Sequence, residues 1–272
     1  MARYHRTQGV CLRRIDYSNT SQIATFLTPD AGQLSFIAKG IRRAPKRGIR
    51  RGLELTARYD LVYFKRRSSS LYNLTEASML EPFGGTRTAV ERTLCAYYAA
   101  ELMRNLTAEE DPCAPLYALL VETLRRLSDG DRLGLSVLVL ELAALQHHGA
   151  CPTFDACAEC EQALSLRGRL LFSAPQGGPL CPQCGRDLHP RPERGVFPVR
   201  AERLEALATL AAESPPRIDA VRMAPRDIVA ASRLLRVHIQ YLLGKELRLW
   251  KYLHGRHLSR ALRRIRRAAA RA

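Results

Sequence analysis

The sequence predicts a multidomain α+β protein: an N-terminal five-stranded β-barrel, then a helical body with a four-cysteine module inserted between its helices. Three observations support this fold class. Short alternating segments fill the first 81 residues, apolar residues take helical spacing from residue 87, and two C-x-x-C pairs lie between residues 157 and 184. Because 272 residues suffice for several domains, we expect segments 1–81, 82–150, 151–190 and 191–272.

The N-terminal segment has the pattern of a small barrel. Apolar and β-branched residues alternate over 10–17, 23–28, 33–38, 53–64 and 71–75, and turn-forming residues separate these runs. The turn at 29–32 joins two of them into a hairpin over 23–38. Five short strands of this length fit an OB-fold, although the pattern alone does not separate it from an SH3-like barrel.

The helical body is expected to contain five helices, over 87–106, 116–127, 133–148, 200–212 and 228–254. The third is apolar on most faces, which places it at the centre of a bundle. Asp227 follows Pro225 and is the expected N-cap of the last helix. The cysteine-rich segment falls between the third and fourth helices, so it is an insertion into the helical body.

The strongest single motif is a four-thiolate metal site. Cys157 and Cys160 form one pair, and Cys181 and Cys184 form the other after twenty residues. This spacing is typical of a zinc site, and four protein ligands leave no position for water, so we expect one structural Zn²⁺ per chain. Gly185, directly after the second pair, is expected to adopt a positive φ.

Alternatives for the cysteines remain open at this stage. Two redox or disulfide pairs are one, although a thioredoxin-like site needs a single pair at the start of a helix. His189 or Cys151 could replace one of the four ligands. The remaining cysteines, Cys11, Cys95 and Cys113, have apolar neighbours and are expected to be buried thiols.

Composition indicates a polyanionic partner. The net charge is +17, and it is concentrated in residues 1–81 (+9) and 201–272 (+10), while 82–150 carries −3. A basic chain of this kind has the charge expected of a nucleic-acid-binding protein. The absence of an apolar run long enough to span a membrane and of a signal-like N-terminus leads us to expect a cytoplasmic, nucleoid-associated protein with reduced thiols and no membrane partner.

Candidate DNA-binding residues cluster in one loop between the third and fourth strands. Seven cations occupy thirteen residues without an acid: Lys39, Arg42, Arg43, Lys46, Arg47, Arg50 and Arg51. Four further cations on the barrel could extend this surface: Arg13, Arg14, Lys65 and Arg66. The alternative is a solvated basic loop without a partner. Strand aromatics could stack on bases, but most are expected in the core, and the Arg-rich tail after residue 255 is either a second DNA contact or disordered.

The sequence gives no indication of an active site. It contains no G-x-x-x-x-G-K-S/T phosphate loop and no clustered Asp and Glu residues for paired magnesium ions. We therefore expect a protein that is not an enzyme.

Motifs in a fixed order resemble those of the RecO family of recombination mediators, and of its Deinococcus-type members in particular. They lie at 7–18, 27–32, 38–40, 76–83 and 97–102, and continue with the two cysteine pairs around Phe172-Ser173 and Gly177-Gly178. The last eighty residues match only in helical character. His147, His148 and Cys151 depart from the apolar stretch usual at that place, so the local loop there is not implied by the family pattern.

The resemblance implies an OB-fold, a helical body and a zinc module. It also implies binding to single- and double-stranded DNA, annealing of complementary strands, partnership with RecR, contact with the acidic tail of single-stranded DNA-binding protein, and indirect assistance in loading RecA. For the acidic tail, the sequence suggests Arg233, Arg236 and Lys245 on the last long helix. The alternative function is a zinc-containing structural or ribosome-associated RNA-binding protein.

Overall fold

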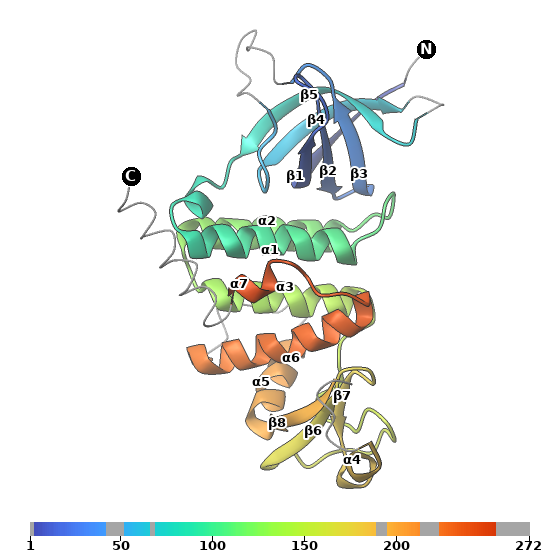
Figure 1. The fold of residues 1–272 in the computed structure, drawn as a ribbon, viewed down its shortest axis with the longest axis vertical. Coiled ribbons are helices and arrows are strands. Elements are labelled where there is room, and N and C mark those ends of the chain that lie inside the picture. The colour runs from blue at the N-terminus through green and yellow to red at the C-terminus, as the bar shows by residue number, and fades with distance from the viewer. Residues whose placement is uncertain (1–2, 42–51, 66–68, 189–194, 213–222, 254–272) are drawn as a thin grey trace. The chain divides into compact units, whose positions relative to one another are not determined.

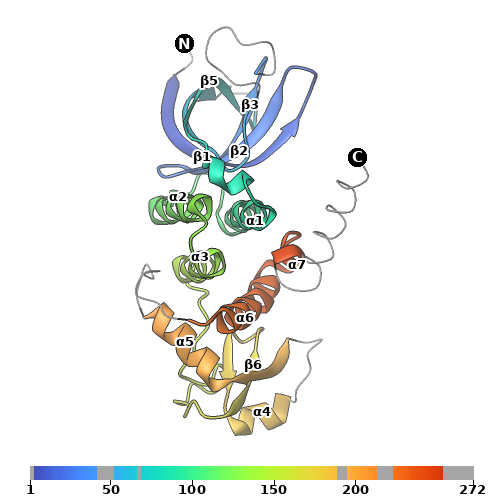
Figure 2. The ribbon, with the colours of Figure 1, turned by 90° about the vertical axis from the view of Figure 1, so that its left-hand side faces the viewer.

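The structure is a computed structural model that describes residues 3–41, 52–65, 69–188, 195–212 and 223–253. The chain forms two compact units, one of residues 1–133 together with 251–272 and one of residues 134–250 (Figures 1 and 2). The division into four domains expected from the sequence stays a prediction. Among the described residues, no helix is both long and apolar enough to cross a membrane.

The first unit begins with a closed five-stranded barrel. Its strands are β1 (Tyr4–Asp16), β2 (Gln22–Thr28), β3 (Gly32–Ala38), β4 (Arg58–Lys65) and β5 (Tyr72–Glu81). Their order around the barrel is β1-β2-β3-β5-β4, with β4 returning to β1, and only the β3–β5 pair is parallel. The five predicted strands are confirmed, but β1 and β5 are longer than the alternating pattern indicates. In contrast, β4 begins only at Arg58, after Thr56 with its φ of 64°.

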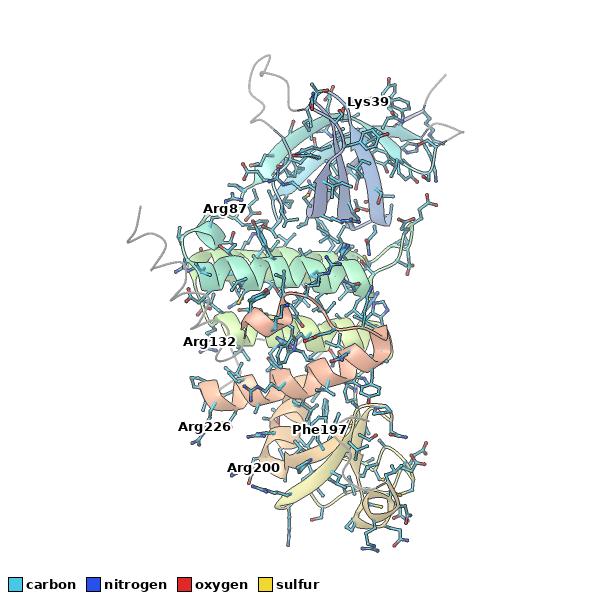
Figure 3. The ribbon with its side chains drawn as sticks, in the orientation of Figure 1. Lys39, Arg87, Arg132, Phe197, Arg200 and Arg226 are labelled. Carbon is cyan, nitrogen blue, oxygen red and sulfur yellow. The ribbon has the colours of Figure 1, made fainter. Side chains whose placement is uncertain are left out.

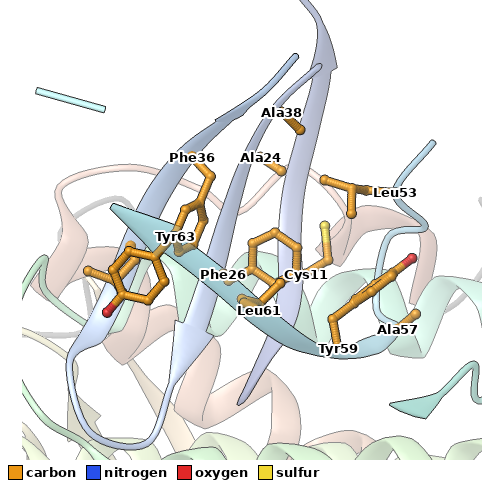
Figure 4. Packing of buried hydrophobic residues seen from close by; sticks show 11 residues of the cluster. Cys11, Ala24, Phe26, Phe36, Ala38, Leu53, Ala57, Tyr59, Leu61 and Tyr63 are labelled. Atoms are coloured by element: carbon orange, nitrogen blue, oxygen red, sulfur yellow. The ribbon is translucent and has the colours of Figure 1, made fainter. Parts of the chain in front are cut away.

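The barrel interior is filled by alternate residues of its strands (Figure 4). Phe26 and Phe36 are fully buried and meet edge to face with their ring centroids 5.6 Å apart. Tyr59 and Tyr63 are also buried, and each packs edge to face on one of the two phenylalanines. The expectation that most strand aromatics belong to the core is therefore confirmed, because these rings have no surface on which a base could stack.

Three helices of the first unit follow the barrel: the short 3-10 helix η1 (Gly84–Arg87), α1 (Val90–Leu106) and α2 (Ala114–Asp129). The side-chain amide of Gln33 on β3 donates to the Arg104 carbonyl and to Thr107 Oγ1, both at 2.9 Å, so it caps the end of α1. Gly130 ends α2 in the left-handed conformation, with φ 81°. The Gln33 hydrogen bonds join the barrel to α1 within one unit.

The second unit is built around α3 (Leu133–His147), with α5 (Ala201–Ala211) and α6 (Pro225–Leu243). It ends at Trp250, the first residue of the short helix α7 (Trp250–Leu253). Every residue from 135 to 145 is buried, which confirms the central position predicted for α3. Glu141 in its middle is fully buried and accepts a hydrogen bond from Arg236 Nε of α6 at 3.0 Å. The Arg236 guanidinium also lies over the Trp250 ring, 3.9 Å from its centroid.

Two expectations for the last helix are wrong. The helix does not continue to residue 254, because Gly244 takes a φ of 63° and ends α6 at Leu243. Asp227 is not the N-cap. Ala224 holds that position, and Asp227 lies in the first turn, where its charge still favours the helix dipole.

The cysteine-containing module has its own small sheet. Strands β6 (Arg169–Ser173), β7 (Gly178–Leu180) and β8 (Val196–Arg200) pair in the order β7-β6-β8, all antiparallel. Strands β6 and β7 form a hairpin. The third strand and helix α4 (Pro182–Leu188) were not predicted, because each is short and has no clear periodic pattern.

Candidate metal centre and nucleic-acid surface

The four predicted cysteine ligands lie together. The sulfurs of Cys157, Cys160, Cys181 and Cys184 are all within 4.8 Å of one another. The Cys160 and Cys181 sulfurs are 3.9 Å apart. Four thiolates at about 2.3 Å from a tetrahedral Zn²⁺ would be separated by about 3.8 Å. The cluster is therefore compatible with a structural metal such as zinc.

The backbone around each cysteine pair forms a tight turn. In the first pair the Glu161 amide donates to the Cys157 carbonyl, and in the second the Gly185 amide donates to the Cys181 carbonyl, both at 2.8 Å. The expectation of a positive φ at Gly185 is wrong, because this residue lies within α4. Glu161, after the first pair, takes the left-handed conformation instead, with φ 61°. Its residue type gives no signal for this.

Backbone amides around the sulfurs favour thiolate at one ligand. Burial opposes ionisation of the Cys157 thiol. Backbone amides, the largest contribution being that of Cys181, outweigh this effect and lower its pKa to about 6. The Cys181 amide lies 3.2 Å from the Cys157 sulfur. The Cys184 thiol has a raised pKa, chiefly because it shares a hydrogen bond with Cys181. A bound metal cation would stabilise the thiolate form of all four cysteines, because metal binding displaces the thiol protons.

The other cysteines lie outside the cluster. Cys151 is half-buried, and desolvation raises its pKa to about 11. Cys11, Cys95 and Cys113 are buried, as expected for structural thiols. His189, the other alternative ligand, lies outside the described residues.

The described residues include the two ends of the predicted basic loop, residues 39–41 and 52–53. Six of its cations (Arg42, Arg43, Lys46, Arg47, Arg50, Arg51) and also Arg66 lie outside the described residues. Lys39 is exposed at the end of β3 (Figure 3). The Gly52 amide donates to the Ile41 carbonyl at 3.3 Å, and the Leu53 amide to Gln22 Oε1 at 2.8 Å. The segment therefore leaves the barrel and returns to it at one place.

Arg13 and Arg14 on β1 lie near this place. Both side chains are exposed. A register shift between Cys11 and Arg13 interrupts the alternation of β1. Arg14 Nη1 donates to the Leu53 carbonyl at 2.9 Å, so it also supports the returning end of the loop.

Lys65 differs from the other predicted DNA-binding residues because it already has an anionic partner. Its Nζ lies 2.5 Å from Glu110 Oε1 and 4.8 Å from the centroid of the Tyr72 ring. Hydrogen bonds from Lys65 and Tyr72 lower the pKa of Glu110. Nothing in the sequence near Lys65 indicates Glu110 as a partner, because Glu110 belongs to the α1–α2 connection, 45 residues further along the chain.

The three residues suggested for an acidic tail separate into two kinds. Arg233 and Lys245 are exposed. Arg236 is 3% exposed, pairs with Glu141 and packs on the Trp250 ring. A peptide could therefore reach Arg236 only if these contacts were broken.

Comparisons with known proteins cover nearly the whole chain. Residues 1–83 match the family model "Recombination protein O N terminal", and residues 87–251 match "Recombination protein O C terminal". The "DNA repair protein RecO" of an Anaeromyxobacter species is 34% identical over 253 residues, covering 90% of this chain and 93% of the relative. The proteins of the same name from a Roseiflexus species (30%; 92% and 85% covered) and Syntrophus aciditrophicus (28%; 92% and 95%) are also similar. The chain therefore belongs to the RecO family of DNA repair proteins.

Proposed function

We propose that this protein is a recombination mediator without enzymatic activity, acting in the cytoplasm at the nucleoid. In this proposal it binds single- and double-stranded DNA through phosphate contacts and anneals complementary strands. With RecR it helps to load RecA on single strands coated with single-stranded DNA-binding protein. Family membership supports the repair role, and the names of the relatives state no more than that.

The observation that carries the DNA-binding proposal is the anchored base of the basic loop. Gly52, Leu53 and Arg14 fix its two ends at one side of the barrel, where Arg13 and Lys39 are exposed. Between these two ends, the sequence of residues 42–51 has six further cations and no acid. Contacts of this kind bind phosphate without reading base sequence.

The barrel itself supports the same role. Five strands in the order β1-β2-β3-β5-β4, closed by one parallel pair, agree with an OB-fold, which is a five-stranded Greek-key barrel used for oligonucleotides. We therefore include OB-fold in the proposal. Because the buried aromatics cannot stack on bases, phosphate contacts are expected to dominate.

Annealing needs no nucleotide in this proposal. Two complementary strands repel each other through their phosphates, and a protein with a net charge of +17 screens both. Base pairing supplies the free energy. Zn²⁺ on Cys157, Cys160, Cys181 and Cys184 would hold the module together and take no part in chemistry.

The partner proposals rest on the family resemblance. For the acidic tail of single-stranded DNA-binding protein, the exposed Arg233 and Lys245 of α6 and the segment after it remain candidates, and Arg236 is left out because it is buried.

Strand annealing tests the proposal. Complementary oligonucleotides coated with single-stranded DNA-binding protein are mixed with the zinc-loaded protein in the absence of nucleotide, and duplex formation is followed by fluorescence. We expect faster annealing than without protein. In parallel, binding to a single strand is measured at several salt concentrations. Substituting R42A, R43A, R50A and R51A together should reduce the slope of log K against log salt by about 3, since each single-strand contact contributes about 0.7.

A matched variant controls for net charge. R226A with K251A removes two exposed cations of α6 and α7 and is compared with R42A plus R43A. Only the loop pair should change the slope. An unchanged slope in the loop variant would refute the assignment of this loop. Failure of the wild-type protein to bind DNA, or tighter binding to structured RNA in competition, would refute the function.

A further inference from the structure

The zinc module has an open pocket of about 530 Å³ whose role the proposed function does not include. Most of its wall is aliphatic (Leu170, Leu171, Leu180 and Pro182), and Gly185 and the proposed zinc ligand Cys181 complete it. Two exposed arginines, Arg169 of β6 and Arg186 of α4, also line it. The pocket therefore combines an apolar interior with positive charge at its edge.

The metal cluster and the pocket share one face of the small sheet. Leu171 packs beside Leu180, Cys157 and Cys181 in the same apolar cluster. A side chain on Gly185 would place its Cβ 3.3 Å from Leu171 Cδ1, so the glycine lets α4 approach this strand. The pocket is thus formed by the same packing that brings the cysteines together.

A third arginine stands beside the pocket. Arg169 of β6 lies directly opposite Arg200 of the antiparallel strand β8, and both side chains are exposed (Figure 3 labels Arg200). Side chains opposite each other in such a pair lie on the same face, about 5 Å apart at Cβ. They share this face with Leu171, because alternate residues of a strand point the same way.

This arrangement of arginines is unfavourable without an anion. Like charges directly opposite in a sheet repel each other. In the described part of the chain, Arg169 and Arg200 form no ion pair and no side-chain hydrogen bond. Arg186 bonds only to the neutral Gln183 side chain, at 2.6 Å. The module thus has three cations around an apolar pocket, and none of them is neutralised by an acid among the described residues.

The features suit a ligand that has an anionic group next to a flat apolar group. A nucleotide of a single strand has both, since the phosphate can accept charge-assisted hydrogen bonds from two guanidinium groups while the base enters the pocket. A base within a duplex is stacked and paired, and cannot enter. The pocket therefore favours single-stranded over double-stranded DNA.

We infer that Arg169, Arg186 and Arg200 form a second binding site for single-stranded DNA on the zinc module. A phosphate lies between Arg169 and Arg200, and an unstacked base occupies the pocket beside Leu171. This inference rests on the proposed function, because it adds a second DNA contact to the same activity. A site on the barrel and a site on the zinc module give one molecule two places at which to hold complementary strands.

The test compares two double variants of the full, zinc-loaded chain. R169Q with R200Q removes the paired arginines. R167Q with R226Q removes two exposed cations outside the pocket, one from the same module. Binding of a fluorescent oligo-dT is measured by anisotropy across salt concentrations. We expect R169Q/R200Q to bind roughly tenfold more weakly and to reduce the salt slope by about 1.4, while the control stays near wild type.

Two further measurements keep the outcome clear. Zinc content establishes that each variant retains its module, and R186Q alone, which changes an exposed residue outside the sheet, repeats the test if the double variant loses zinc. An oligonucleotide carrying one 4-thiothymidine should cross-link to the peptide between residues 169 and 186, and less so after R169Q/R200Q.

Distinct results would overturn the inference or the function beneath it. If R169Q/R200Q binds oligo-dT like the control, there is no second site. If it binds DNA normally but loses affinity for a glutamate-rich octapeptide, the pocket takes an acidic protein segment instead. If the loop substitutions weaken DNA binding and R169Q/R200Q does not, only this inference fails. If wild-type protein does not bind DNA, the proposed function fails as well.

Discussion

The barrel and the zinc module are both small β structures, but their interiors differ. The barrel encloses a cluster of eleven buried residues inside a closed ladder of strands. The corresponding cluster of the module has four buried residues, and two of these, Cys157 and Cys181, are proposed zinc ligands. The barrel is held by apolar packing, whereas the metal ligands form half of the buried cluster on the cysteine-bearing side of the module's sheet. Phe172, which points to the opposite side of that sheet, is also fully buried.

The difference indicates what each fold depends on. A fully buried Leu or Phe contributes about 1.5–3 kcal/mol, so a core of the barrel's size needs no metal. A structural zinc contributes on the order of 10 kcal/mol, which is more than Leu180 and Val196 can supply together. The metal therefore takes the place of a core on the cysteine-bearing side of the module's sheet.

Removing the metal should have the largest effect. C157S with C181S, or a strong chelator, is expected to abolish zinc binding and with it stabilisation on the order of 10 kcal/mol in the module. Hydrogen exchange followed by mass spectrometry should show β6, β7 and β8 losing protection, while β2 and β3 of the barrel keep theirs.

Cys151 provides the control for this experiment. It precedes Cys157 by six residues and lies outside the sulfur cluster, so C151S should retain one zinc per chain and normal exchange. Loss of zinc in C151S would contradict the assignment of the four ligands. A module that stays protected without metal would contradict the contrast between the two regions.

The reverse experiment removes part of the barrel core. Phe26→Ala deletes a fully buried ring and is expected to destabilise the first unit by about 3–5 kcal/mol, without changing zinc content. Tyr4→Ala, which removes a ring that is 61% exposed on the same barrel, should have little effect. Denaturant unfolding and zinc analysis of both variants measure this. Equal effects of the two substitutions would show that the barrel does not depend on its interior.

Much of this architecture could be predicted from the sequence because its signals are local. Alternation and turn residues indicate five strands, and uniform apolarity indicates the burial of α3. The C-x-x-C spacing brings Cys157 and Cys160, like Cys181 and Cys184, close enough to share a metal.

Other features depend on contacts between distant residues and give no local signal. Nothing in the sequence near Lys65 indicates its pairing with Glu110. Charge alone suggested Arg236 as a contact for an acidic peptide, although Arg236 is buried and pairs with Glu141 inside the second unit. The opposition of Arg169 and Arg200 arises only once the short strand β8 pairs with β6. Predictions of binding residues from charge alone therefore include buried cations and omit cations brought together by the fold.

A smaller effect is expected where the module's sheet meets α6. His238 is buried, and its Nδ1 and Nε2 lie 2.8 and 2.9 Å from the carbonyl oxygens of Ala174 and Ala150. A neutral imidazole has one N–H to donate, so His238→Leu leaves at least one of these carbonyls without its donor, which should cost about 1–3 kcal/mol. Denaturant unfolding measures the loss, and Q240L at an exposed site of the same helix is the matched control. A loss of zinc in His238→Leu would show that the module also depends on this contact.

The smallest effect concerns charge on the barrel, where Lys65 is paired, in contrast to the arginines of the module. Because hydrogen bonds from Lys65 and Tyr72 lower its pKa, Glu110 is a carboxylate at neutral pH and opposes phosphate binding at Lys65. E110Q should leave Lys65 available to DNA and increase the salt slope by at most about 0.7. E109Q removes the same charge from the exposed neighbouring residue and should change the slope less. An equal increase in both variants would assign the effect to net charge rather than to Lys65.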